Sequence, residues 1–306
     1  MGHLIIPGIV EPLTAPSNLP EVGVALNDCT WKEIRAVSDA GLASNYFAVG
    51  DTKAVLVKGT IGTLSVNATY YVYIIGIDHN ESIEGKGITF GTFKTAASGG
   101  VDVALCDSKY GNDMYSSGAK YFNAAHWGYV SAGVGWRGCD MRYDILGSTD
   151  VAPGGYGSTA SRVGYDASAT CATNPVANTL MAALPTDLRA VMKPMVIYTD
   201  NVGDGNNTAS YVTQTVDYLP LLSQLEVLGR TSQANSAEKN YQAQYAYYSA
   251  GNSKIKYKHN ATGTAALWWQ RSPSYYGSAF CIAYTDGSDA TGNVGAVYGI
   301  APIFRV

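Results

Sequence analysis

Three runs of β-branched and aromatic residues, each bounded by glycine or polar turn residues, constrain the fold more than any other feature of this chain. They cover residues 54–57, 69–77 and 87–90. Such side chains favour strands, and short connections between successive strands favour antiparallel pairing. We therefore predict an antiparallel β-meander between Lys53 and Phe93.

The segment before this meander has the spacing of an amphipathic helix. Trp31, Ile34 and Val37 recur at three-residue intervals, and the run ends at Gly41. An apolar stripe at this spacing needs a surface to cover. We expect the helix to dock on the sheet, with Asp28 as its N-terminal cap.

The rest of the chain alternates short elements with long polar loops. Helical spacing is present at 136–146, 179–183 and 185–192, strand-like runs at 101–105, 194–198 and 218–222, and loops at 147–175 and 200–213. No repeat of fixed period and no linker interrupts this order. We predict one α+β domain over residues 29–306, with antiparallel sheets, two or three short helices and long loops, after an extended lead over residues 1–28.

Composition and charge exclude several classes of partner. The 306 residues are 46% hydrophobic and 14% charged, and the net charge is −4. No basic stripe is available to bind nucleic acid, and no run approaches the ~20 apolar residues that membrane insertion requires. The first residues lack the basic and apolar regions of a signal peptide, so we expect synthesis in the cytoplasm.

The five cysteines are Cys29, Cys106, Cys139, Cys171 and Cys281, and none belongs to a C-x-x-C pair. Their wide spacing does not suggest zinc binding or a redox pair. We expect mostly reduced thiols in the core, and neither a metal nor a cofactor.

Candidates for catalysis are few. His79 follows a predicted strand, where an acid or base could act, but a turn with local hydrogen bonds explains it as well and is favoured. His126 lies in an aromatic stretch and suits core packing better than stacking on a ligand. Residues 200–207 resemble a calcium loop but lack the closing Glu of an EF-hand. No catalytic residue is predicted, because the known catalytic and nucleotide-binding motifs are absent.

Tyrosine and glycine dominate the composition in an unusual way. The chain has 23 Tyr and 34 Gly. Tyrosine offers a large amphipathic contact area at low entropic cost, and glycine provides adaptable loops, a combination typical of binding surfaces. A β-rich protein with tyrosine in its strands would have the same bias, so both interpretations stay open.

The most specific pattern lies in the C-terminal segment 268–306. Trp268-Trp269 and the final Ile-Ala-Pro-Ile-Phe are apolar anchors for strands, Arg271 suits a buried charged hydrogen bond, and Asp286-Gly287 is a hairpin turn signal. The motifs W-W-x-R-S, F-C, D-G-S and G-I-x-P-x-F follow one another in this segment. In this order they resemble an uncharacterised bacterial and phage domain family, and the resemblance extends upstream to the Trp-Lys-Glu-Ile motif at 31–34.

This resemblance implies a C-type-lectin-like fold with a C-terminal region of the kind that diversity-generating retroelements vary. Such elements mutate adenines, chiefly in Asn codons, while a fixed scaffold holds the changing residues. An AAC codon randomised at both adenines never encodes Lys, Glu, Gln, Met or Trp, which make up 36 of the 306 residues. The window from Ser274 to Tyr298 contains none of them where about 3 are expected, an outcome with roughly 5% probability by chance.

The resemblance also divides the tail into scaffold and variable ligand-binding positions. The scaffold residues are Trp268, Trp269, Arg271, Phe280, Asp286, Gly287 and Phe304. The ligand-binding positions are Ser274, Tyr275, Tyr276, Gly277, Ala279, Ile282, Tyr284, Thr285, Asp289, Ala290, Thr291, Asn293, Gly295, Val297 and Tyr298. We expect the ligand-binding positions to face solvent, with the tyrosines as contact anchors, and the flanking anchors to be buried.

These features predict a binding protein and not an enzyme. We expect the ligand to be a protein or a cell surface. The protein would be displayed on a phage particle or on a bacterial surface, and it could form a homo-oligomer in either place. The first alternative is an invariant structural or assembly module of the same fold. An oxidase of the formylglycine-generating type is disfavoured because Cys281 has no partner cysteine near it in sequence. The calcium motifs of sugar-binding lectins are absent, which argues against calcium-dependent sugar binding.

Overall fold

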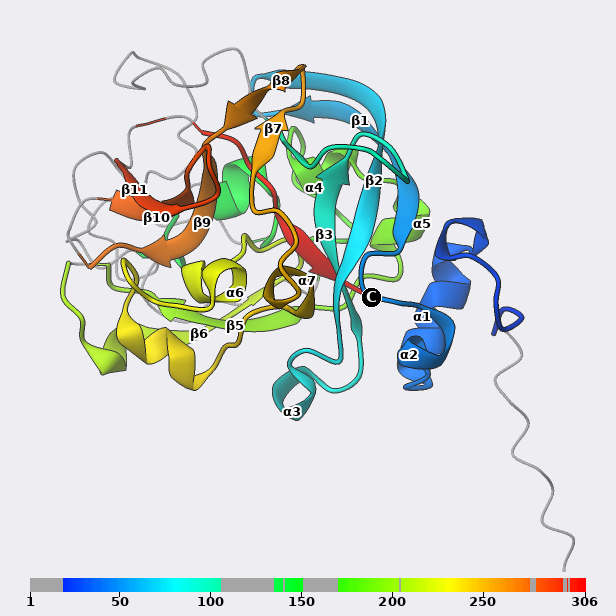
Figure 1. The fold of residues 1–306 in the computed structure, drawn as a ribbon, viewed down its shortest axis with the longest axis horizontal. Helices are drawn as coiled ribbons and strands as arrows, with labels where there is room; N and C mark the ends of the chain where they lie inside the picture. The colour runs from blue at the N-terminus through cyan, green and yellow to red at the C-terminus, as the bar shows by residue number, and fades with distance from the viewer. Residues whose placement is uncertain are drawn as a thin grey trace, which may run out of the picture.

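A curled antiparallel sheet, which joins the predicted meander to the last strand of the chain, organises the fold (Figure 1). The computed structural model describes residues 19–105, 135–139, 141–150, 170–203, 205–275, 279–293, 296 and 298–306. The sheet has the order β1-β2-β3-β12, with β1 at Thr52–Ile61, β2 at Leu64–Ile77, β3 at Ile88–Lys94 and β12 at Ile303–Arg305. The predicted meander is confirmed, and β12 extends it by pairing with β3.

The alternation of side chains along β1 decides which face of the sheet is buried. Val55 and Val57 are buried, whereas Leu56 between them is 47% exposed. Successive side chains of a strand point to opposite faces, so the valines cover the core and Leu56 faces solvent. Gly62 turns the chain from β1 into β2 with φ +58°, a conformation that costs glycine little.

Helix α1 at Trp31–Asp39 docks on this sheet as predicted. The ring of Trp31 lies 5.5 Å from that of Phe90 in β3 and 5.9 Å from that of Phe304 in β12. The predicted cap is wrong, because Thr30 and not Asp28 precedes the helix. Thr30 accepts a hydrogen bond from the Glu33 backbone and donates its own N–H to the Glu33 carboxylate, a reciprocal capping box.

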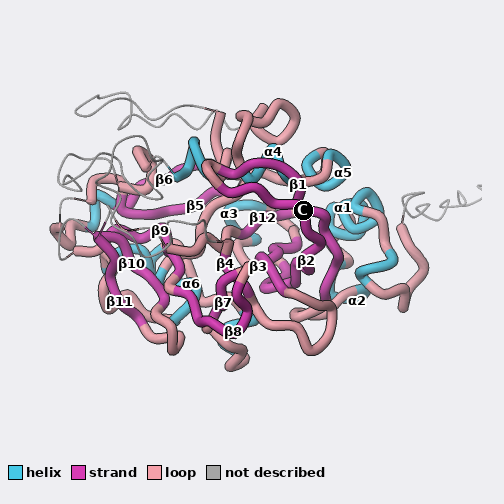
Figure 2. The backbone as a smooth tube through the Cα atoms, turned by 90° about the horizontal axis from the view of Figure 1, so that it is seen from above, coloured by secondary structure: helices cyan, strands magenta, loops and turns pink. Residues whose placement is uncertain are grey.

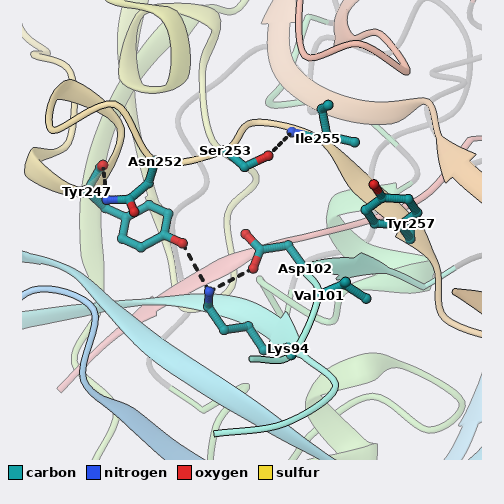
Figure 3. A pocket seen from close by; sticks show the side chains of 9 residues that line it. Lys94, Val101, Asp102, Tyr247, Asn252, Ser253, Ile255 and Tyr257 are labelled. Carbon is teal, nitrogen blue, oxygen red and sulfur yellow. Dashed lines mark hydrogen bonds and ion pairs between the residues drawn. The ribbon is translucent and has the colours of Figure 1, made fainter. Parts of the chain in front are cut away.

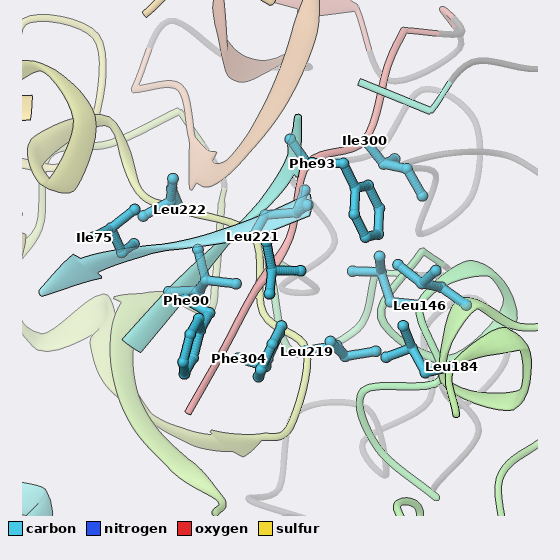
Figure 4. Packing of buried hydrophobic residues seen from close by; sticks show 14 of the residues in the cluster. Ile75, Phe90, Phe93, Leu146, Leu184, Leu219, Leu221, Leu222, Ile300 and Phe304 are labelled. Carbon is cyan, nitrogen blue, oxygen red and sulfur yellow. The ribbon is translucent and has the colours of Figure 1, made fainter. Parts of the chain in front are cut away.

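Buried leucines of the segment 219–222, which follows β6, pack against the phenylalanines of the sheet (Figure 4). Phe90 and Phe304 are stacked 5.1 Å apart, and Leu219 and Leu221 are fully buried beside them. The predicted strand at 218–222 is wrong. Its backbone groups bond to three separate segments: the Tyr218 N–H donates to Ser148, and the carbonyls of Pro220 and Leu222 accept from β12 and β9. The strand at this point is instead β6 at Val212–Asp217, which pairs with β5 at Met195–Asp200.

Two small sheets complete the described part of the chain. In one, β4 at Val103–Ala104 lies parallel to β7 at Lys256–Lys258, which pairs antiparallel with β8 at Ala261–Ala266. The other contains β9 at Trp268–Pro273, β10 at Ala279–Ala283 and β11 at Asp289–Asn293. The fold is therefore α+β with mostly antiparallel sheets, as predicted.

Short helices are more numerous than predicted. Besides α1 the structure describes α2 Ala43–Tyr46, α3 Glu81–Glu84, α4 Leu180–Ala183, α5 Thr186–Arg189, α6 Gln224–Leu228 and α7 Ala246–Ser249. Only α4 and α5 correspond to predicted short helices. None of the described helices is long and apolar enough to cross a membrane.

The helix predicted at 136–146 is wrong. The described residues form a turn at 135–138 and one π-helical turn at Met141–Ile145. The chain bends here so that Trp136 and Arg142 both donate hydrogen bonds to the buried carboxylate of Asp217. The irregular backbone at 136–146 thus allows the buried Asp217 carboxylate to receive hydrogen bonds that a regular helix would not provide.

Several other predictions fall partly outside the described residues. Of the extended lead, only residues 19–28 are described, and Leu26–Asp28 forms a 3-10 turn. Most of the loop at 147–175 lies outside as well, as do Cys106 and His126. The other four cysteines are buried and free, in agreement with the predicted core role.

Phe304→Ala tests whether β12 is part of the core that the sheet depends on. The side chain is fully buried against Phe90 and Trp31, so we expect the free energy of unfolding to fall by about 3–5 kcal/mol. The matched control is Tyr284→Ala, at a position that is 47% exposed and should change stability by less than about 0.5 kcal/mol. Urea unfolding measures both, and equal losses would contradict this assignment.

Candidate functional site

The predicted recognition segment forms a three-stranded sheet, β9-β10-β11, which we call the tail sheet. It lies at the opposite end of the molecule from α1 in both views (Figures 1 and 2). The predicted turn connects β10 to β11: Gly287 has φ +82°, and the Asp286 carboxylate accepts the Ser288 N–H at 2.9 Å. Glycine accepts this backbone conformation without strain, which explains the turn at this position.

Arg271 anchors the tail sheet to the rest of the molecule. Its two terminal nitrogens donate to the two carboxylate oxygens of Glu226 in α6 at 2.6 and 2.7 Å. The guanidinium also donates to the Thr199 hydroxyl at 2.9 Å and to the Leu221 carbonyl at 2.6 Å. Burial opposes the positive charge, but the Glu226 carboxylate holds the pKa of Arg271 above its ordinary value. The predicted buried charged hydrogen bond is confirmed.

A second buried contact follows one residue later in β9. The Ser272 hydroxyl donates to one carboxyl oxygen of Glu238 at 2.7 Å, and the Asp200 N–H donates to the other at 3.3 Å. Burial raises the pKa of Glu238 to about 8, although the Ser272 hydrogen bond and Arg271 act in the opposite direction. At neutral pH this carboxyl is therefore mostly protonated.

Tyr298 belongs partly to the scaffold. Its ring lies 4.8 Å from that of Trp269, and a side chain on Gly292 would collide with both rings. The absence of a side chain at Gly292 thus makes room for the Tyr298 ring to pack on Trp269. Trp269 shares this face with Ile282, its cross-strand partner in β10. The packing leaves Tyr298 half-buried rather than free to point into solvent.

The predicted division into buried anchors and exposed positions holds for part of the tail sheet. Trp268, Trp269, Arg271, Phe280 and Phe304 are at most 2% exposed, as expected for anchors.

For two predicted ligand-binding positions the expected exposure is wrong, since Ile282 is 2% and Ser274 1% exposed. Ile282 is covered because it belongs to the hydrophobic core cluster together with its cross-strand partner Trp269. Ser274 is covered because its backbone forms a bridge with Ala234.

The exposed positions concentrate on the edge strand and the end of β10. Tyr284, Thr291 and Asn293 are exposed, and we call these three residues the tail rim. Half-buried positions border them: Tyr275, Ala279, Thr285, Asp289, Ala290 and Tyr298. Tyr276, Gly277, Gly295 and Val297 lie outside the described residues. The structure thus brings nine of the eleven described positions to the surface or partly so.

A segment that no sequence pattern predicts contacts two of the half-buried residues that border the tail rim. Arg230 and Ser232 both contact the Asp289 carboxylate, and the Tyr275 hydroxyl donates to the Ser232 carbonyl at 3.0 Å. These residues are more than 40 positions apart from their partners, and no local spacing marks them. Only the fold reveals that they orient the site.

The candidates for acid–base and calcium chemistry have local structural partners. The His79 ring stacks on Tyr245 with centroids 3.7 Å apart and lies 3.1 Å from the Ala243 carbonyl, and burial lowers its pKa. In the run at 200–207 that resembles a calcium loop, the Asp200 carboxylate accepts backbone hydrogen bonds from Val202 and Gly203. Among the described residues no group of three or more acidic, His or Cys side chains is placed to hold a metal.

Glu226→Leu tests the anchoring role of the ion pair. The variant leaves the Arg271 guanidinium buried without its carboxylate, so we expect a loss of about 3–5 kcal/mol in the free energy of unfolding. The double variant Arg271→Met/Glu226→Leu removes both charges and should recover most of that loss. Denaturant unfolding of the wild type, Glu226→Leu, Arg271→Met and the double variant measures the coupling, and purely additive losses would show that the pair is not the anchor.

The buried carboxyl of Glu238 should make stability depend on pH. Its pKa is about 8 in the folded chain and ~4.3 in an unfolded one, so the folded state binds the proton more tightly. This contribution is complete below about pH 4 and is lost as the pH rises through 8. We expect Glu238→Gln to flatten the decline of melting temperature between about pH 5 and 8, whereas Glu33→Gln at a half-buried position leaves that decline unchanged. Identical profiles for wild type and Glu238→Gln would refute the assignment.

Comparison with known proteins places most of this chain in one family. Residues 119–306 match the family model described as a domain of unknown function, DUF6273. No curated protein and no solved structure matches the chain.

Proposed function

The chain belongs to the DUF6273 family, and we propose that it is a ligand-binding protein that presents changeable side chains on a fixed scaffold. The observation that carries this proposal is the contrast within the tail sheet. The apolar anchors and Arg271 are almost completely buried, whereas Tyr284 after the end of β10 is 47% exposed and Thr291 and Asn293 on the edge strand β11 are exposed. Such a surface can change its side chains without disturbing the core beneath.

The composition of the tail supports the same proposal. The window from Ser274 to Tyr298 lacks all five residue types that a diversified Asn codon cannot encode. We propose that a retroelement varies this window and that the scaffold has the C-type-lectin-like fold. The α+β architecture with mostly antiparallel sheets is compatible with that fold.

The chemistry at the site favours binding over catalysis. Burial raises the pKa of the Cys281 thiol well above its ordinary range, which makes this cysteine a poor nucleophile. It lies in the central strand of the tail sheet and has no exposed surface. Cys281 is therefore proposed as a packing residue and not as the reactive thiol of an oxidase.

The tail rim suits a protein or cell-surface ligand. A partly exposed tyrosine beside small polar residues offers aromatic contact area together with hydrogen-bonding groups, as in antibody-like binding surfaces. We propose that the protein serves attachment on a phage particle or a bacterial surface.

The burial of two predicted variable positions favours a second candidate function, that of an invariant structural or assembly module. Ile282 and Ser274 are as buried as the anchors, and Tyr298 packs on Trp269. An invariant structural or assembly module of the same fold would have this property. The two candidates differ at the gene: a neighbouring reverse transcriptase and a near-copy of the 3′ end that differs only at adenines support the first, and a locus without both favours the second.

Substitution of the tail rim tests recognition directly. We expect Tyr284→Ser with Thr291→Ala and Asn293→Ala to weaken binding to target cells at least thirtyfold, because one aromatic hot spot contributes about 2 kcal/mol. The matched control is Leu56→Ser in β1, at a position with the same 47% exposure as Tyr284. Flow cytometry of labelled protein on a panel of bacteria measures both variants. A folded triple variant that binds as tightly as the parent would move recognition away from the rim.

A further inference from the structure

A small cavity opens beside the ends of β3, β4 and β7, away from the tail rim (Figure 3). Its volume is about 250 Å³, roughly the space of eight water molecules. Polar groups of Lys94, Asp102 and Tyr247 meet at one side of it. Val101, Ile255 and Tyr257 contribute apolar surface to the lining.

Lys94 and Asp102 line the polar side of this cavity, and the buried Lys256 lies next to Asp102 without lining the cavity. The Lys94 ammonium lies 3.0 Å from one oxygen of the Asp102 carboxylate, and the Lys256 ammonium lies 3.8 Å from the other. All three side chains are at least four-fifths buried. In the described part of the chain, neither lysine forms an ion pair with any other carboxylate. Two amines therefore share a single counter-charge, which leaves room for a second anion.

Lys94 remains an ammonium in this position. Burial opposes its charge, but Asp102 and the Tyr247 hydroxyl raise its pKa above the ordinary value. Burial lowers the pKa of Lys256, which donates hydrogen bonds to the Tyr73 hydroxyl and the Thr92 carbonyl. The accessible positive group at the cavity is thus Lys94.

Lys94 and Tyr247 each have a proton at the cavity that donates to no oxygen among the described residues. An ammonium has three protons, and Lys94 directs one toward Asp102 and one to the Tyr247 hydroxyl at 3.0 Å. Its third proton has no oxygen acceptor among the described residues. The Tyr247 hydroxyl accepts from Lys94, so its own proton is also available to a ligand. Two such donors 3.0 Å apart can hold the oxygens of one carboxylate.

We propose that this cavity binds the carboxylate of a small organic acid, held by Lys94 and Tyr247, with its apolar part against Val101, Ile255 and Tyr257. The volume suits a ligand of around ten non-hydrogen atoms. The apolar lining favours an organic acid over inorganic phosphate. The acid can be a free metabolite or the C-terminus of a peptide, since both present the same carboxylate.

The cavity is separate from the tail rim but borders the tail sheet. Ile255 lies 3.4 Å from the position that a side chain on Gly287 would occupy, in the turn between β10 and β11. The binding of an acid here does not depend on the proposed recognition function. Variants of Lys94 and of Tyr284 therefore test the two proposals independently.

Titration calorimetry and ligand-observed NMR with defined probes test the proposal. The probes are 3-phenylpropionate, its neutral isostere 3-phenylpropionamide, N-acetylglycylphenylalanine and inorganic phosphate. We expect one-to-one saturable binding of the organic acids and at least tenfold weaker binding of the amide and of phosphate. If the peptide acid binds more tightly than 3-phenylpropionate, the natural source of the carboxylate is a chain terminus; the reverse order identifies a free acid.

Three variants complete the experiment. Lys94→Met keeps the length of the side chain and leaves Asp102 paired with Lys256, and we expect it to weaken acid binding at least tenfold. Tyr247→Phe removes only the hydroxyl and should weaken binding severalfold, while Lys58→Met on the exposed part of β1 should leave it unchanged. The proposal is overturned if neither acid binds the folded wild-type protein at 10 mM, if the amide binds equally well, or if folded Lys94→Met binds as the parent does.

Discussion

The buried ion pair between Arg271 and Glu226 is the interaction on which the tail sheet depends. Removing two charges from water is costly, and the cost is offset only when every donor finds an acceptor. Here the acceptors come from three different places: α6, the Thr199 hydroxyl of β5 and the Leu221 carbonyl. A shift of β9 by two residues would bury the guanidinium without these partners. The ion pair therefore fixes the register of β9 as well as its position.

The register of β9 determines which residues of the tail can change. The side chains from Phe280 to Ala283 alternate between the two faces of the sheet and are all buried, so β10 is covered on both faces. Only the edge strand, the turn and the ends of β10 remain at the surface. The exposed part of the proposed variable window is consequently narrower than the window itself, and it centres on Tyr284 and the exposed residues of β11.

The parts of the fold that were predictable are those specified by neighbours in sequence. The meander and α1 follow from side-chain period, and the turn at Gly287 follows from its residue types. The cap of α1 was misplaced because Asp28 and Thr30 are both good caps, and only the Glu33 partner distinguishes them. The run at 218–222 has the composition of a strand, but its backbone partners lie in three distant segments. Long-range pairing of this kind leaves no local pattern.

The exposure of the proposed binding positions was predictable only in part, and the end of β10 explains why. Ile282 and Tyr284 lie two residues apart in the same window, yet one is buried and the other exposed because β10 ends between them. Beyond Tyr284 the chain must turn at Gly287, where φ is +82° and Ile255 lies within 3.4 Å of an added side chain. Ile255 also lines the carboxylate cavity. A larger residue at 287 would strain the turn and press on the cavity wall, so a changing surface and a constant cavity can coexist only if this glycine does not vary.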